Sequence, residues 1–216
     1  MKTLLTLALG CALAIARTHA ADPGAGWTSM FNGKDLSGWK SNEDTPGAFA
    51  VVDGTLKVSN GPTHLFFVGS TGNATFTNFE FKAKVMTTPG ANSGIYFHTQ
   101  FQAKGWPAQG FECQVNATSS DRRKTGGLYA VQDVLDEAPN KDNVWFDYYI
   151  KVEGKRIVVQ IDGKTTVDWT QPENWDPATA LKDMPGRKLG TGTIALQGHD
   201  PKSPIFYKDM FVRALP

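Results

Sequence analysis

The sequence lacks an excess of charge of either sign. Its 216 residues contain 22 Lys and Arg against 21 Asp and Glu, a formal net charge of +1. Proteins that hold nucleic acid by its phosphates concentrate basic residues on one face, and this chain has no basic run. We therefore expect no nucleic-acid partner.

Long hydrophobic runs are also missing, except for one short run near the N-terminus. Leu4 to Ile15 is nearly all apolar, but about 12 residues fall short of the roughly 20 that a helix needs to cross a bilayer. Lys2 precedes this run and Thr18-His19-Ala20 follows it, which is typical of a secretory signal peptide. We expect residues 1–20 to be cleaved before Ala21, a periplasmic or secreted protein, and no membrane span.

Cysteine is scarce, and only Cys11 and Cys113 are present. Cys11 does not complete a lipoprotein signal, because Ala8 stands where such a signal has Leu, so we do not expect a lipoprotein. Removal of the leader leaves Cys113 alone and excludes an intramolecular disulfide. A chain of about 196 residues can hold itself together by packing, and Cys113 is expected to be a small buried residue.

Helical periodicity is absent, whereas turn residues are plentiful: 22 glycines and 12 prolines lie among β-branched and aromatic residues. Asp53-Gly54 predicts a hairpin, and residues 79–85 alternate between apolar and charged side chains. Roughly ten strands favour an all-β fold, an antiparallel β-sandwich or jelly roll, formed by residues 21–216 as one domain. Residues 172–187 contain three prolines and predict a long excursion with one helical turn. The expected strands are 48–53, 55–59, 79–85, 94–101, 111–115, 148–152, 157–161, 193–197 and 205–212.

Three of these strands carry polar side chains at alternate positions, which project to one face. Their apolar partners would face the core. If the strands are neighbours, a carboxylate, two imidazoles, two carboxamides and a phenol share one surface. The outward sets are Glu112, Gln114 and Asn116; Tyr96 and His98; and Ala195, Gln197 and His199.

Each of these residues also has an ordinary structural interpretation. Glu112 could be a solvated surface residue, a single histidine is more often hydrogen-bonded than catalytic, and the two glutamines could satisfy each other. The convergence of three strands favours a site. Tyr96, Trp106 and Tyr129 are flat platforms on which sugar rings stack, although Trp106 could equally plug a loop.

Ordinary retaining glycosidase chemistry is disfavoured by the strand that carries Glu112. Such enzymes need a second carboxylate about 5 Å away, but positions 114 and 116 hold amides. More distant candidates for a second acid are Asp133, Asp136 and Glu137. His98 and His199 could hold a metal together with Glu112, but their spacing is not diagnostic and we assign no metal. A Ser-His-Asp mechanism has no nucleophile elbow in this sequence to support it.

A series of motifs resembles the 3-keto-disaccharide hydrolase domain family from about Trp27 to Leu215. The motifs are FNGKDLSGW at 31–39, NSGIYF at 92–97, GFECQ at 110–114, TGGLY at 125–129 and GTIALQGH at 192–199. The resemblance implies an exported bacterial protein with a jelly roll of the concanavalin-A-like lectin/glucanase type. It implies 3-keto-glucoside lyase and 3-keto-2-hydroxy-glucal hydratase activity without a cofactor, on oxidised sugars made by a glycoside 3-oxidoreductase. Gly198 and Asp200 depart from the family's usual closing phrase, Leu-Gln-Asp-His-Gly.

This chemistry needs one base, because the C3 ketone acidifies the proton on C2. We predict Glu112 as the base, or else His98 or His199, with an imidazolium protonating the departing oxygen. The predicted substrate-binding groups, which include donors to an enolate, are Tyr96, Gln114, Asn116, Lys124, Tyr129 and Gln197. Two other hypotheses are compatible with the sequence, a non-catalytic carbohydrate-binding (lectin-like) module and a calcium-dependent adhesion module.

Overall fold

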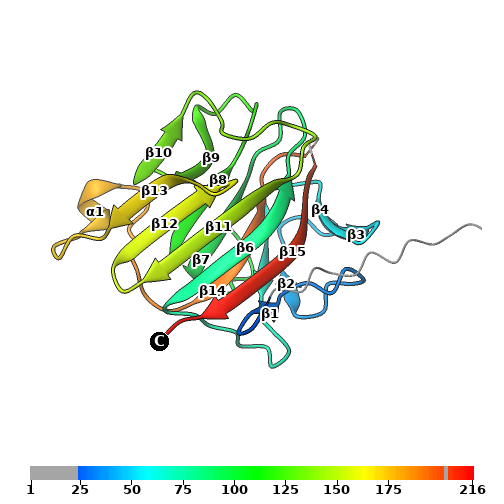
Figure 1. Ribbon diagram of the computed structural model, residues 1–216, viewed down its shortest axis with the longest axis horizontal. Helices are drawn as coiled ribbons and strands as arrows, with labels where there is room; N and C mark the ends of the chain where they lie inside the picture. Colours follow the sequence, from blue (N-terminus) through cyan, green and yellow to red (C-terminus); the bar gives the residue numbers. More distant parts are fainter. Residues whose placement is uncertain (1–23, 202–203) are drawn as a thin grey trace, which may run out of the picture.

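The computed structural model describes residues 24–201 and 204–216 (Figure 1). The predicted signal peptide, residues 1–20, lies outside these ranges. Within them, no helix is both long enough and apolar enough to span a membrane.

The described chain forms two antiparallel sheets packed face to face, so the predicted all-β sandwich is confirmed. In Figure 1 the strands β12, β11, β6 and β15 lie side by side in front of β7 and β14. The first sheet has the order β13-β12-β11-β6-β15-β4-β3, with β1 paired to β15, and the second has the order β10-β9-β8-β7-β14-β5-β2. The first comprises β1 (Thr28–Ser29), β3 (Phe49–Val52), β4 (Thr55–Val58), β6 (Phe79–Met86), β11 (Phe146–Glu153), β12 (Arg156–Ile161), β13 (Lys164–Thr170) and β15 (Ile205–Ala214). The second comprises β2 (Trp39–Ser41), β5 (Thr63–Phe67), β7 (Ser93–Thr99), β8 (Phe111–Val115), β9 (Arg123–Leu128), β10 (Gln132–Leu135) and β14 (Thr193–Gly198).

Two tight turns are formed by Asp-Gly pairs, one of them at the predicted Asp53-Gly54 hairpin. Asp53 and Gly54 join β3 to β4 with positive φ values of 49° and 75°. Asp162 and Gly163 join β12 to β13 with φ values of 48° and 75°. Both central residues of this hairpin turn need positive φ, which Asp tolerates and Gly adopts without strain.

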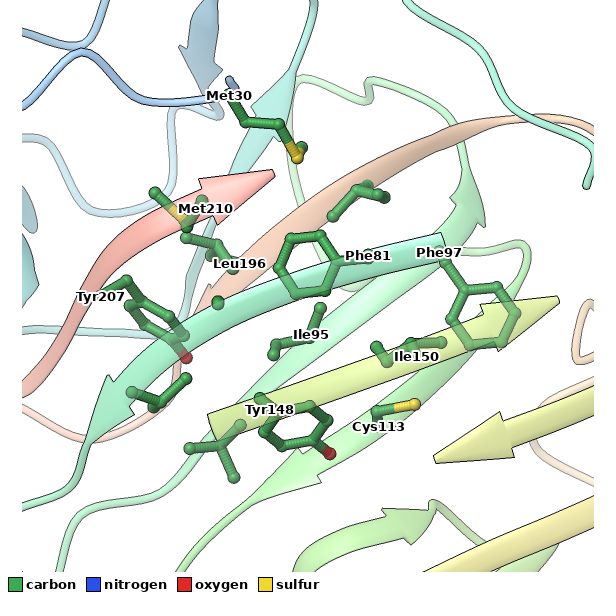
Figure 2. Close-up of a cluster of buried hydrophobic side chains, with 14 of the residues drawn as sticks. Met30, Phe81, Ile95, Phe97, Cys113, Tyr148, Ile150, Leu196, Tyr207 and Met210 are labelled. Carbon is green, nitrogen blue, oxygen red and sulfur yellow. The ribbon is translucent and has the colours of Figure 1, made fainter. Parts of the chain in front are cut away.

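The core lies between the sheets and draws apolar side chains from both. Phe81 and Ile150 of the first sheet lie near Ile95, Phe97 and Cys113 of the second (Figure 2). Cys113 is fully buried as a free thiol, as predicted, and burial raises its pKa. This burial removes apolar area from water and supplies the main driving force for folding.

The two sheets differ in what covers their outer faces. In β6 and β11, buried residues alternate with more exposed ones, whereas every residue of β5, β7, β8 and β14 is buried. Residues 101–110 and the predicted excursion at 172–187 lie beside the second sheet and touch each other, since the Gly110 N–H donates to the Gly186 carbonyl at 3.0 Å. The excursion contains one short helix, α1 (Pro177–Ala180), capped by Asp176. Polar residues on this sheet face are therefore enclosed by loops.

Candidate active site

The candidate site begins with strand register in the second sheet. Tyr96 of β7 lies opposite Glu112 of β8 on one side and opposite Ala195 of β14 on the other. Gln197 of β14 lies opposite His64 of β5. Because side chains directly opposite each other share a face, these strands place their polar residues together.

The Glu112 carboxylate is the centre of this group. Its Oε2 accepts hydrogen bonds from the Tyr96 hydroxyl at 2.7 Å and from Arg187 Nη2 at 3.1 Å, and its Oε1 accepts one from Gln197 Nε2 at 3.1 Å. Gln197 Nε2 also lies 3.0 Å from the Tyr96 oxygen, to which it donates. Three residues from separate parts of the chain thus fix one buried acid.

The buried Glu112 carboxyl group holds its proton more strongly than an exposed glutamate does. Burial raises the pKa of Glu112, and the Arg187 charge and the hydrogen bonds from Tyr96 and Gln197 oppose this only in part. Burial and the neighbouring Glu112 charge also raise the pKa of Tyr96. The phenol therefore stays protonated and donates its hydrogen bond.

Gly94 provides the room for the Glu112 side chain. A Cβ atom on Gly94 would lie 2.5 Å from Glu112 Oε1 and 2.8 Å from Glu112 Cγ. Real Cβ atoms do not approach other atoms so closely, so any other residue would push the carboxylate from its position next to Gln197. The glycine of the NSGIYF motif is explained by this close approach rather than by a turn.

Arg187 is a site residue that the sequence analysis missed. It belongs to the non-periodic excursion, where its carbonyl accepts from Trp175 Nε1 at 2.7 Å. Its guanidinium lies 5.1 Å from the centre of the Tyr96 ring and forms a buried ion pair with Glu112. No periodicity relates residue 187 to the sheet, so only the fold brings this charge to the acid.

These residues form the floor of a pocket of about 480 Å³, a size suited to a small ligand. Loop residues enclose it from two sides, with Trp106 and Pro107 from one loop and Met184 and Pro185 from the excursion. The remaining lining residues are Asn92, Tyr96, Ala108, Glu112, Gln114, Asp121, Tyr129, Asp183, Gly186, Arg187, Gln197 and His199.

Six of the predicted site residues meet in this pocket, and they come from β7, β8, β14 and the segments that follow β9 and β14. They are Tyr96, Glu112, Gln114, Tyr129, Gln197 and His199. Gln114 does not pair with Gln197, the ordinary alternative, but donates to Asn92 Oδ1 at 2.5 Å. His199 is partly exposed, and its Nδ1 lies 2.9 Å from Asp200 Oδ1.

His98 does not line this pocket, although it was predicted to share a face with Tyr96. Its φ is +54°, which interrupts the regular alternation of β7. Its Nε2 lies 2.8 Å from the Thr77 carbonyl, and its Nδ1 accepts from the Gly190 N–H at 3.2 Å. Burial lowers the pKa of His98. The ring therefore lines a neighbouring hollow beside Gly190.

Asn116 and Lys124 also lie outside the pocket, contrary to their predicted role. Asn116 Nδ2 donates to the carbonyls of Asp121 and Arg123, at 3.1 and 2.7 Å. Lys124 Nζ donates to the Ser119 carbonyl at 2.8 Å. Both side chains satisfy backbone groups of the loop between β8 and β9.

The distant acids do not supply a second carboxylate. Asp133 pairs with Arg123 and Asp136 with Arg122, and neither these nor Glu137 lines the pocket. Asp121 and Asp183, which the sequence analysis did not select, do line it. Across residues 24–201 and 204–216, no group of three His, Cys, Asp or Glu side chains is arranged to hold a metal ion.

Solved structures with the same architecture define the class of fold. A proposed glycosyl hydrolase from Parabacteroides distasonis ATCC 8503 has a TM-score of 0.75 and 23% identity, over 88% of this chain and 94% of that one. The carbohydrate-binding module CBM66 from Bacillus subtilis has a TM-score of 0.56 and 13% identity, over 82% and 96%. A non-specific endo-β-1,3(4)-glucanase of family GH16, SCLam, has a TM-score of 0.54 and 11% identity, over 90% and 93%. The fold is a jelly roll shared by glycosidases and carbohydrate-binding proteins.

The sequence identifies the family within that class. Residues 26–213 match the model of the 3-keto-alpha-glucoside-1,2-lyase-like domain, the 3-keto-disaccharide hydrolase domain, and the chain belongs to this family. No curated protein matches the chain.

Proposed function

We propose that this protein cleaves 3-keto-glycosides by elimination followed by hydration. A base removes the C2 proton, the C2–H electron pair forms the C1=C2 double bond, and the C1–O bond breaks to release the leaving group as an alcohol. Water then adds its hydroxyl to C1 and its proton to C2 of the 2-hydroxy-glucal. Atoms balance as in hydrolysis, and no oxidant, reductant or cofactor is consumed.

The burial of its carboxylate in the pocket supports Glu112 as the base. Its raised pKa makes it a stronger proton acceptor than an exposed glutamate, which suits removal of a proton from carbon. Arg187 and Gln197 contact the same carboxylate, so a ketone placed beside it would lie near a fixed positive charge and an N–H donor. Such donors stabilise an enolate oxygen as charge develops on it.

His199 is the group that we assign to protonating the leaving oxygen. It is partly exposed at the edge of the pocket, and Asp200 orients its ring through Nδ1. An imidazole can give a proton to the departing alcohol and later accept one from the attacking water.

The same proposal needs an oxidised sugar as substrate. A glycoside 3-oxidoreductase must therefore supply the ketone, and this functional link remains a prediction. Export by the predicted signal peptide is also a prediction, because residues 1–20 lie outside the described part of the chain.

A carbohydrate-binding module without catalysis is the second candidate. It is favoured by the full set of hydrogen bonds at Glu112, since a carboxylate already held by three donors can serve to bind sugar hydroxyls without reacting. The fold is compatible with this role, because CBM66 shares it. Under this hypothesis a 3-keto-glycoside would bind and be recovered intact.

Incubation with a 3-keto-glucoside in D₂O separates the two. We expect release of the alcohol, transient 2-hydroxy-glucal and deuterium at C2 of the product, whereas a binding module would yield none of them.

Glu112→Gln should lower the rate at least about 100-fold. Glu80→Gln is the matched control, because Glu80 is also buried and contacts a tyrosine and an arginine, Tyr149 and Arg213, but lies in the other sheet. Equal rates for Glu112→Gln and the wild type would exclude Glu112 as the base.

A further inference from the structure

A histidine that the proposed mechanism does not use lies next to the pocket floor. His64 of β5 is directly opposite Gln197 of β14, so its side chain lies on the same sheet face. Its ring centre is 5.3 Å from that of Tyr96, with the planes at 89°. His64 thus extends the row of site residues by one strand.

Both ring nitrogens of His64 are buried and without a hydrogen-bond partner. Burial lowers the pKa of His64 to about 4, so the ring is neutral at pH 7 and carries one donor and one acceptor. Buried polar groups are nearly always paired, and a group left unpaired loses the free energy of its hydrogen bonds to water. An unpaired imidazole next to the pocket floor therefore points to a partner that arrives with a ligand.

Trp106 covers His64. Its ring centre lies 5.3 Å from that of His64 and 5.6 Å from that of His199, and its side chain remains half exposed while it lines the pocket. The backbone at this position is held separately, because Gln102 Nε2 donates to the Trp106 carbonyl at 2.6 Å. The loop backbone is therefore held by a contact that does not involve the indole.

We propose that His64 and Trp106 form a second sugar subsite, which binds the leaving-group ring of a 3-keto-disaccharide. This inference rests on the proposed function, because it places the oxidised ring over Glu112. The second ring stacks on the displaced Trp106 indole, and one of its hydroxyls pairs with His64. An exposed indole beside a neutral donor and acceptor suits the flat apolar face and the hydroxyl rim of a sugar. His199, in contact with Trp106, then lies next to the glycosidic oxygen between the two rings.

The test compares two substrates that differ only beyond that oxygen, a 3-keto-disaccharide and methyl 3-keto-glucoside. In His64→Phe, the ratio of kcat/KM for the disaccharide to that for the methyl glycoside should fall at least about tenfold, the factor that 1.4 kcal/mol carries. The melting temperature should hold or rise, because an aromatic ring of similar shape replaces unpaired polar atoms. Trp106→Ala, at an exposed loop position, should lower the same ratio. This variant replaces His64→Phe in the test if His64→Phe does not fold.

Binding provides a readout that does not depend on turnover. In a Glu112→Gln background, calorimetry should show that His64→Phe weakens the disaccharide at least about tenfold more than the methyl glycoside. If wild-type protein turns over neither substrate, the proposed function fails while this affinity comparison still tests the subsite. An unchanged kcat/KM ratio together with unchanged relative affinities would overturn the subsite, as would equal losses for both substrates.

Discussion

Arg187 donates from Nη2 to Glu112 Oε2 across 3.1 Å, although 75 residues separate them in the chain. Both side chains are more than nine-tenths buried, so neither charge is solvated by bulk water. The strength of such a pair depends on both members being present, because either one alone would be a buried, uncompensated charge. This pair ties the excursion at 172–187 to the sheet that carries the candidate base.

Removal of the arginine should therefore cost stability. Arg187→Met should lower the free energy of unfolding by about 3–5 kcal/mol at pH 7, measured by urea denaturation. Arg156→Met is the control, because Arg156 pairs with Asp168 on the surface, where solvent screens the charges, so its loss should cost far less stability than the loss of Arg187. The double variant Arg187→Met/Glu112→Gln should recover much of the loss. Equal losses in the single and double variants would show that charge pairing is not the cause.

A methyl group at Gly94 should displace the Glu112 carboxylate. We expect Gly94→Ala to lower kcat/KM on a 3-keto-glucoside at least about tenfold and to cost about 1–3 kcal/mol of stability through overpacking. Gly190→Ala is the matched control, since a Cβ there would meet no atom within 4 Å. Wild-type activity in Gly94→Ala would mean that the carboxylate position seen here is not the one that reacts.

The pH dependence of activity should report on Glu112. Only the ionised carboxylate can accept the C2 proton, so kcat/KM should rise with pH through a pKa above the ordinary glutamate range. Arg187→Met should shift the rising part of this pH profile to higher pH, because it removes the positive charge that lowers the pKa of Glu112. If the pH profile of kcat/KM is the same in that variant as in the wild type, the titration belongs to another group.

The same pKa shift predicts a pH dependence of stability. Folded Glu112 binds its proton more tightly than it does in the unfolded chain, so the folded state binds more protons between the two pKa values. The contribution of Glu112 to the free energy of unfolding should therefore fall as pH rises from the ordinary glutamate pKa through the raised value. Glu112→Gln should remove this part of the curve, and thermal melts of both proteins at closely spaced pH values would reveal it. Parallel curves would contradict the shift.

The two histidines of the predicted site should behave differently when each is replaced. His199→Gln should lower turnover at least about tenfold, because it removes the proton donor that we assign. His98→Gln should stay within about threefold of wild-type turnover and lose about 1–3 kcal/mol of stability, since it disturbs hydrogen bonds to Thr77 and Gly190. Rate assays and denaturation curves for both variants test this, and a large rate loss in His98→Gln alone would reverse the assignment.

Local sequence signals determined much of the fold. Asp53-Gly54 and Asp162-Gly163 dictate turns through backbone sterics, and the alternation in residues 79–85 dictates which side of β6 is buried. The short strand β5 escaped prediction because its sequence ends in Leu65-Phe66-Phe67 and shows no alternation of polar and apolar residues. His64 was missed along with that strand.

The sequence by itself determined most of the strands, several turns and the family motifs, because these depend on side-chain alternation and on residues close together in the chain. It also brought Tyr96, Glu112 and Gln197 together as candidates, since regular strands put alternate residues on one face. Only the tertiary structure placed His98 outside the pocket lining, and only it supplied Arg187 and covered His64 with Trp106. Loops carry no periodicity, so the charges and rings they bring to a sheet are decided by packing across the whole fold.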